Sequence, residues 1–205
     1  MLKHYGLPVA RHILIRNPED FSFEEVVQKI GMPLFVKPCR EGSSIGVTKV
    51  HSEDEYNLAL KKAFVADPKV LAEEFVDGRE IECSVLGNDN PEAAEVLGEI
   101  VPLRGFYSYD AKYVDEDAAD LIIPAKIKPE VALQIRKAAV EAFILTECRG
   151  MARVDFFLGK DNSFIVNEIN TLPGFTKISM FPKLWESSGL PYPKLLEKLI
   201  ELAIE

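Results

Sequence analysis

Residues 151–170 read MARVDFFLGKDNSFIVNEIN, and this stretch indicates the fold more clearly than any other part of the chain. Two runs with strand-like alternation, 151–158 and 164–169, flank the sequence GKDN at 159–162. Side chains of a strand point alternately to its two faces, and short loops rich in Gly, Asp and Asn join antiparallel strands. The stretch therefore predicts a β-hairpin.

Four polar side chains share one face of this hairpin. Residues i and i+2 of a strand lie on the same face, which groups Arg153 with Asp155 and Glu168 with Asn170. A turn centred between residues 161 and 162 places Arg153 opposite Asn170 and Asp155 opposite Glu168. Carboxylate and amide oxygens suit Mg²⁺ or Mn²⁺, and an adjacent Arg neutralises phosphate. The pattern predicts a metal site, and the alternative is a solvent-facing hairpin with ordinary ion pairs.

The rest of the chain alternates short helices with short strands. Capping-box patterns begin the segments 22–31 and 52–66, and Pro129 suits the first turn of a helix over 129–147. Two further short helices are expected near 181–186 and 193–203. Strand-like runs occupy 34–38, 47–50, 70–75, 81–85 and 92–101. These elements predict an α+β protein with mostly antiparallel sheets, and the aperiodic segment 104–124 predicts a lid loop.

Composition excludes several classes of protein. The 205 residues carry a formal net charge of −9, which argues against sequence-independent binding to nucleic acid or an anionic membrane. The chain contains no apolar run long enough for a membrane span and no signal peptide. Its three scattered cysteines indicate a reduced, cytoplasmic protein rather than a disulfide scaffold.

A second candidate site is the loop EGSSIG at 41–46. Its glycines allow the backbone to approach a ligand, and Ser43 and Ser44 offer donors to phosphate oxygens, although the loop matches no Walker motif. The alternative is a Gly/Ser loop without function. Lys37 favours the phosphate site, because a cation inside an apolar strand needs an anionic partner. Lys112 would supply a second cation when the lid closes.

The segment 70–76 ends a strand, where backbone groups can bind an adenine edge, and Glu80 can accept ribose hydroxyls. The alternative is that these paired glutamates are simply solvated. Together with this segment and the two candidate sites, seven short motifs resemble the D-alanine–D-alanine ligases of the ATP-grasp superfamily. They are VKP at 36–38, REGSS at 40–44, FYSYDAKY at 106–113, ARVD at 152–155, NEIN at 167–170, TLPGFT at 171–176 and SMFP at 179–182.

The resemblance extends over almost the whole chain and implies an ATP-grasp fold, in which two α+β subdomains clamp ATP. We expect the central, smaller subdomain at residues 1–72 and the C-terminal subdomain at 73–205, with the lid loop at 104–124. The implied nucleotide contacts are Lys37 to the α- and β-phosphates, Lys112 to the γ-phosphate, and Ser43 and Ser44 over the phosphates. For adenine and ribose they are Glu73, the backbone of Glu74 and Val76, and Glu80.

The same resemblance implies a reaction in which ATP activates one D-alanine as an acyl phosphate, which a second D-alanine attacks. Two Mg²⁺ ions would be bound by Asp155, Glu168 and Asn170. Arg153 and the amide of Gly174 would stabilise the developing charge, and Ser179 and Met180 would bind the carboxylate of the second D-alanine. Ser43 and Tyr113 would belong to a set of hydrogen-bonded residues at the first D-alanine. Tyr113 and Met180 favour the dipeptide-forming enzymes over D-alanine–D-lactate ligases.

The family also has an N-terminal domain of about ninety residues, the size of a small domain, which binds the first D-alanine. We expect this chain to lack it, so a separate domain or chain would have to supply that function, and a homodimer is compatible with the family. Two alternatives stay open. One is a module that binds ATP and Mg²⁺ without ligating, and the other is an ATP-grasp ligase with a different carboxylate substrate.

Overall fold

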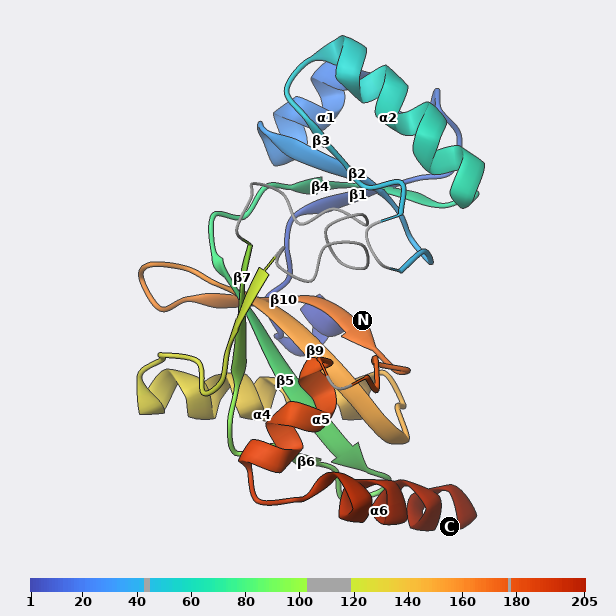
Figure 1. The fold of residues 1–205 in the computed structure, drawn as a ribbon. Helices are drawn as coiled ribbons and strands as arrows, with labels where there is room; N and C mark the ends of the chain where they lie inside the picture. The colour runs from blue at the N-terminus through green and yellow to red at the C-terminus, as the bar shows by residue number, and fades with distance from the viewer. Residues whose placement is uncertain (43–44, 103–118, 177) are drawn as a thin grey trace. The chain divides into compact units, whose positions relative to one another are not determined.

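A computed structural model, shown in Figure 1, describes residues 1–42, 45–102, 119–176 and 178–205. The contacts divide the chain into two compact units. One contains Met1–Val9, Asp77–Val101 and Asp120–Glu205, and the other contains Ala10–Val76 together with Pro102 and Ala119. The subdomain boundary expected at residues 72/73 falls inside strand β4 (Val70–Glu74), whereas the contacts divide the chain after Val76.

The unit built on residues 10–76 contains a four-stranded antiparallel sheet in the order β1-β4-β2-β3. Besides β4, its strands are β1 (His12–Ile15), β2 (Leu34–Pro38) and β3 (Thr48–Val50). Helices α1 (Phe23–Ile30) and α2 (Glu53–Ala66) pack on one face of the sheet (Figure 1). β1 was not predicted, because four residues give too short a pattern to recognise.

Both helices begin at the serines expected to cap them, but only one has a complete capping box. In α1, Ser22 Oγ accepts from the amide of Glu25, and the Glu25 carboxylate accepts from the amide of Ser22. In α2, Ser52 accepts from the amide of Glu55, yet the Glu55 carboxylate accepts from the amide of His51, at 2.6 Å. The capping box predicted at Ser52 is therefore only half correct: Ser52 caps the helix, but the Glu55 carboxylate does not accept from the amide of Ser52.

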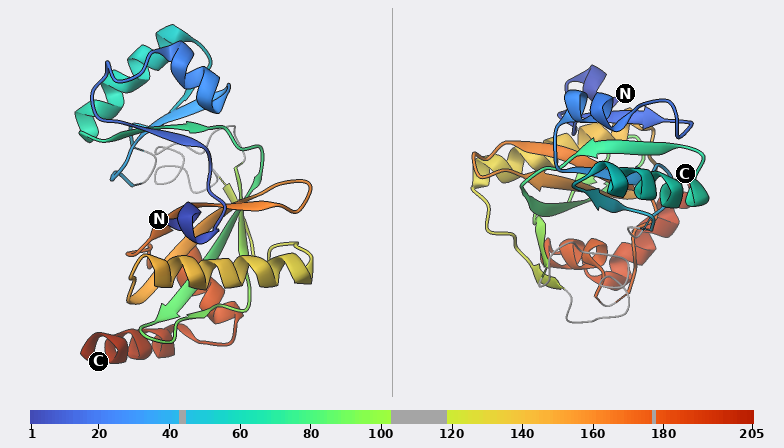
Figure 2. Two further views of the ribbon diagram at one scale, coloured as in Figure 1. Left: turned by 180° about the vertical axis from the view of Figure 1, so that it is seen from behind. Right: turned by 90° about the horizontal axis from the view of Figure 1, so that it is seen from above.

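The other unit is built around a six-stranded sheet ordered β10-β9-β5-β7-β8, with β6 paired to β5. Its strands are β5 (Arg79–Gly87), β6 (Glu92–Ala93), β7 (Gly98–Pro102), β8 (Ala119–Ile122), β9 (Gly150–Leu158) and β10 (Phe164–Asn170). Helix α4 (Pro129–Leu145) covers one face and α5 (Met180–Ser187) packs on the other, as the two opposite views in Figures 1 and 2 show. The short 3₁₀ helix Leu2–Tyr5 and α6 (Tyr192–Ile204) complete the unit.

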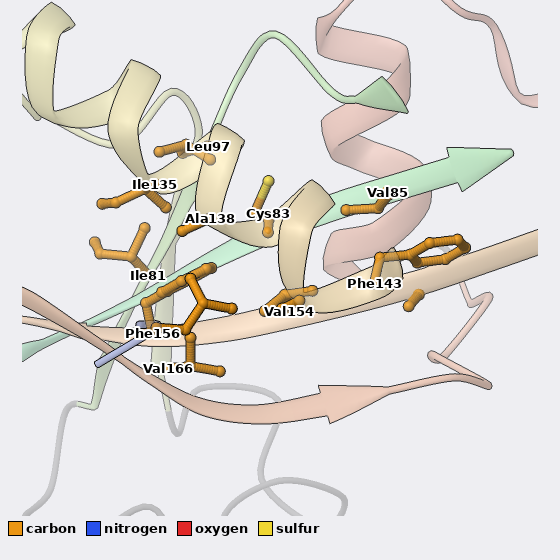
Figure 3. Packing of buried hydrophobic residues seen from close by; sticks show 14 of the residues in the cluster. Ile81, Cys83, Val85, Leu97, Ile135, Ala138, Phe143, Val154, Phe156 and Val166 are labelled. Atoms are coloured by element: carbon orange, nitrogen blue, oxygen red, sulfur yellow. The ribbon is translucent and has the colours of Figure 1, made fainter. Parts of the chain in front are cut away.

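The core of this unit lies between α4 and the sheet (Figure 3). Ile135 and Phe143 of α4 are fully buried against Ile81 and Val154 of β5 and β9. Each such side chain contributes about 1.5–3 kcal/mol by leaving water. The three cysteines are free, and Cys83 is buried in this core. The packing fixes β5 and β9 rigidly, so the side chains on their opposite face are held in place.

One expectation about this unit needs correction, and another lies mostly outside the described residues. The run 92–101 is not one strand but two, β6 and β7, because the backbone leaves the sheet between them. The amide of Ala94 still donates to the carbonyl of Ser84 on β5, whereas the amide of Val96 donates to Ser188 Oγ. The expected lid 104–124 lies mostly outside the described residues, but its last part forms β8 and its continuation. Within the described ranges, no helix is long and apolar enough to cross a membrane.

Candidate functional site

The hairpin β9–β10 pairs its polar residues as predicted, with Asp155 opposite Glu168 and Arg153 opposite Asn170. The register reaches this pairing by a route that the sequence did not indicate. Near the turn, Phe164 pairs with Leu158, and the register then shifts between Val166 and Glu168. One extra residue in a strand is a β-bulge, and bulges re-aim side chains beside functional sites. Without the bulge, Asp155 and Glu168 would still occupy alternating positions in their strands, but they would not lie opposite each other.

Strand β5 adds further polar side chains on the same face. Glu82 lies opposite Asp155, and Ser84 lies opposite Arg153. Glu82, Asp155 and Glu168 thus form one row across three neighbouring strands, here called the acidic row. Alternation in 81–85 had indicated a polar face, but no sequence signal predicts that β5 pairs with a strand about seventy residues later. Glu82 is therefore the site residue that sequence reasoning missed.

Arg153 is held by carboxylates on two sides. Its Nε and Nη2 donate to the two oxygens of Asp155, each at 2.7 Å. The same Nε lies 3.1 Å from Oε2 of Glu82. Burial alone would lower the pKa of Arg153, but the charges of Asp155, Glu82 and Glu168 raise it above its usual value. The neighbouring carboxylates therefore favour the charged form of Arg153.

The carboxyl of Asp155 is buried at the centre of the acidic row. Burial raises its pKa to about 6, an effect that Arg153 opposes and that the nearby Glu168 reinforces. Asn170 Nδ2 lies 2.9 Å from Asp155 Oδ2 and 3.2 Å from Glu168 Oε1. The two carboxylates and the amide are thus close enough to surround a single point, beside a surplus of negative charge.

These side chains fit a divalent cation by the chemistry of their donors. Mg²⁺ and Mn²⁺ are commonly held by one or two carboxylates plus substrate oxygens, so a cage of protein ligands is not needed. Binding would require Asn170 to present its amide oxygen in place of Nδ2. In the part of the chain that the structure describes, no group of three or more His, Cys, Asp or Glu could hold a metal. The expected set of two carboxylates and one amide remains a prediction.

The loop after β10 brings together two of the residues assigned to the acceptor substrate. A Cβ added to Gly174 would lie 2.8 Å from Ser179 Oγ, so a glycine lets the backbone approach this hydroxyl closely. Ser179 Oγ also accepts from the amide of Thr176, at 2.9 Å. Met180 begins α5, but its side chain is 4% exposed and packs against Gly98. A role for Met180 in binding would therefore involve its backbone.

Two of the residues expected to hold the nucleotide on the other unit, Lys37 and Glu73, lie on the sheet face that α1 and α2 leave uncovered. Lys37 and Glu73 form an ion pair there, with Nζ 2.6 Å from Oε1. The Glu74 carboxylate binds Arg11, accepting from its amide and from its Nε. The amide of Glu74 donates to the Arg11 carbonyl. No sequence pattern indicates this role of Arg11.

The remaining predicted residues are divided between described and undescribed parts of the chain. Glu80 lies two residues before Glu82 on β5, which puts it on the same face as the acidic row. Val76 ends the segment Ala10–Val76 of the unit that contains Lys37. The residues Ser43, Ser44, Lys112 and Tyr113 lie outside the described residues.

Comparison with known proteins is decisive on the family. A family model described as "D-ala D-ala ligase C-terminus" matches residues 1–201. The chain belongs to this family. Among curated members, the D-alanine--D-alanine ligase A of Escherichia coli (strain K12) is 54% identical over 207 aligned residues, which cover 100% of this chain and 57% of the relative. The D-alanine--D-alanine ligase of Oceanobacillus iheyensis is 53% identical, with 100% and 56% covered.

Solved structures agree with the family and show that the chain has an ATP-grasp fold. The D-alanine-D-alanine ligase from Coxiella burnetii matches with a TM-score of 0.84 and 41% identity, over 99% of this chain and 54% of that one. The VanG D-Ala:D-Ser ligase from Enterococcus faecalis matches with a TM-score of 0.85 and 35% identity, over 98% and 58%. This member of the D-Ala–D-Ala ligase family therefore spans little more than half the length of its relatives.

Proposed function

We propose that this chain is the ATP- and metal-binding part of a ligase that joins two D-alanines into D-alanyl-D-alanine for peptidoglycan precursors in the cytoplasm. The observation that carries the proposal is the placement of Arg153 beside Asp155, with Glu168 and Asn170 opposite them on one hairpin. A guanidinium next to paired carboxylates suits phosphoryl transfer, which depends mainly on positioning and on neutralising charge.

The proposed reaction has two steps. A carboxylate oxygen of the first D-alanine attacks the γ-phosphorus of ATP, and ADP leaves. The amine of the second D-alanine then attacks the carbonyl carbon of the D-alanyl phosphate, loses a proton, and inorganic phosphate leaves. Neither step needs a nucleophile from the protein. This agrees with a hairpin face that offers a guanidinium, carboxylates and amides.

Each group of residues has a defined task in this proposal. Lys37 would bind the phosphates, and Glu73, Glu80 and the backbone of Glu74 and Val76 would bind adenine and ribose. Arg153 and the Gly174 amide would face the oxyanion, where such donors typically contribute about 10²–10³ in rate. Ser179 and the backbone of Met180 would position the acceptor. Two Mg²⁺ ions held by Asp155, Glu168 and Asn170 would neutralise the phosphate oxygens.

Four assignments in residues 43–44 and 103–118 complete the proposal. Ser43 and Ser44 would cover the phosphates, Lys112 would bind the γ-phosphate, and Tyr113 would join Ser43 near the first D-alanine.

A second candidate function is binding of ATP and Mg²⁺ without ligation by the chain alone. It is favoured by the coverage, because the chain spans 57% of the Escherichia coli relative.

The test is to mix the chain with ATP, Mg²⁺ and D-alanine and to follow phosphate release. The same assay is repeated with the remaining N-terminal part of the Escherichia coli relative added as a separate chain, and with D-serine or D-lactate as acceptor. We expect D-alanine-dependent phosphate release that the added part increases. Nucleotide binding without any amino-acid-dependent release, with or without that part, would favour the binding module.

A further inference from the structure

Glu82 is a buried carboxylate in the middle of the polar face of β5. Its residue exposure is 4%, and it lies opposite both Asp155 on β9 and Gly98 on β7. Burying a carboxylate costs free energy unless other groups compensate the lost water. One compensating group at this position is the guanidinium of Arg153, whose Nε lies 3.1 Å from Oε2. Arg153 is therefore a charged partner of this buried carboxylate.

Arg153 and a metal ion would compete for the same carboxylate oxygens of Asp155. Both carboxylate oxygens of Asp155 accept from Arg153, and Oδ2 also accepts from Asn170. A divalent cation bound by Asp155 would draw on these same oxygens. The ion pair between Asp155 and Arg153 would then loosen, and the partly buried guanidinium would lose part of its counter-charge.

Glu82 lies close enough to Arg153 to remain its ion-pair partner when Asp155 binds a metal ion. We propose that Glu82 is a positioning residue, which holds the Arg153 guanidinium in place when Asp155 turns from Arg153 to the metal ion. Glu82 would keep the Arg153 guanidinium within the site while its contacts to Asp155 loosen, so that the groups released from Asp155 could reach the reacting phosphate. The inference rests on the proposed function, because it assigns Asp155 to the metal and Arg153 to the developing charge.

The geometry of the acidic row separates Glu82 from the metal ligands. Neighbouring strands are about 4.8 Å apart, so the backbones of Glu82 and Glu168 are separated by about 10 Å, with β9 between them. The three carboxylates accordingly do not form a metal-binding group among the described residues. Glu168 and Asn170 lie on the β10 side of Asp155, whereas Glu82 lies on the β5 side, next to Arg153. The row thus has a metal side and a guanidinium side.

A matched set of variants tests this division. The whole chain is prepared as wild type, Glu82→Gln, Arg153→Met and the double variant, and ADP affinity is measured by calorimetry with and without saturating Mn²⁺. The readout is the factor by which Mn²⁺ tightens ADP binding. We expect Glu82→Gln to lower this factor about five-fold, because Arg153 then competes harder for Asp155. In the Arg153→Met background the same substitution should change it less than about two-fold.

A second measurement observes Arg153 directly and does not use the ADP affinity as its readout. The Nε–H signal of Arg153 in NMR spectra, assigned by its loss in Arg153→Met, reports whether the guanidinium is held. We expect it to persist when Mg²⁺ and ADP are added to wild type and to broaden in Glu82→Gln. Glu82→Asp, which keeps the charge, should partly restore it, whereas a purely structural role would not follow the charge.

The outcomes separate this inference from the proposed function. If Mn²⁺ does not tighten ADP binding to wild type, the proposed metal site fails and the role of Glu82 fails with it. If wild type responds but Glu82→Gln behaves like it in both measurements, only the role of Glu82 is overturned. An equal loss in the presence and absence of Arg153 would also overturn it, because Glu82 would then act without Arg153.

Discussion

The ammonium group of Lys37 lies 2.6 Å from Oε1 of Glu73, on the face of the β1–β4 sheet that the helices leave uncovered. Both residues are proposed to contact nucleotide, so in the ligand-free chain each neutralises the other. We predict that Lys37→Met weakens ADP binding about 10- to 100-fold, the worth of one or two charge-assisted hydrogen bonds. Adenosine binding should change little, because it has no phosphate.

Calorimetry with ADP and adenosine checks this prediction, and Lys61→Met is the matched control. Lys61 is an exposed lysine on α2, which covers the opposite face of the same sheet. A similar loss for ADP and adenosine in Lys37→Met would contradict the assignment, because it would indicate a damaged unit rather than a lost phosphate contact.

The hairpin β9–β10 gives the second prediction. Asp155→Asn and Glu168→Gln should each reduce the Mn²⁺-dependent part of ADP affinity by about ten-fold or more, because each removes a charged ligand oxygen. The metal-independent part should change less. Calorimetric titrations at zero and saturating Mn²⁺ measure both parts, with Glu141→Gln on the exposed side of α4 as the control. Unchanged metal dependence in both variants would count against the site.

The acidic row shows which features of the site could be predicted from the sequence and which could not. Asp155 and Glu168 were predicted to face each other from a turn centred between residues 161 and 162, but the strands next to the turn pair one residue out of that register and the bulge restores the pairing. Glu82 could not be predicted, because its pairing with Asp155 joins segments 73 residues apart, and such pairing depends on the tertiary fold. The bulge before Glu168 was missed as well, since one extra residue leaves no mark on a strand pattern.

The same distinction holds for the rest of the fold. Helices with strong local signals, such as the capping serines and Pro129, lie where they were predicted. The short β1 and the break between β6 and β7 depend on partners elsewhere in the chain, which are β4 for β1 and Ser188 for the break. Conversely, the counterion Arg11 of Glu74 has no local signal, because 63 residues separate the two.

Gly98 and Met180 give a stability prediction. A Cβ on Gly98 would collide with the Sδ and Cε atoms of Met180 and would lie 3.2 Å from Leu184 Cδ2. Gly98→Ala should therefore lower the free energy of unfolding by about 1–3 kcal/mol through overpacking. Urea unfolding measures the loss, and the penalty should shrink in a Met180→Ala background. Gly42→Ala is the control, since among the described residues no atom lies within 4 Å of its added Cβ. A full penalty in that background would exclude Met180 as the cause.

The pH dependence of stability should depend on Asp67, which ends α2 and is 2% exposed. Its carboxylate accepts from the Arg40 side chain and from the amides of Arg40 and Lys69. The Arg40 hydrogen bonds hold the pKa of Asp67 well below its usual value, although burial would raise it. A carboxyl with a lowered folded-state pKa stabilises the fold above its unfolded pKa, near 4, and this contribution is lost as the pH falls further.

We therefore predict that Asp67→Asn has a lower melting temperature than wild type at pH 7 and that the difference narrows as the pH falls from about 5 to 2. Melting curves across this range measure the difference, with Asp120→Asn at an exposed position as the control. The sign follows from the ionised form, since only the charged carboxylate of Asp67 accepts all of its hydrogen bonds. A difference that stays constant down to pH 2 would show that Asp67 stabilises the fold by shape and not by charge.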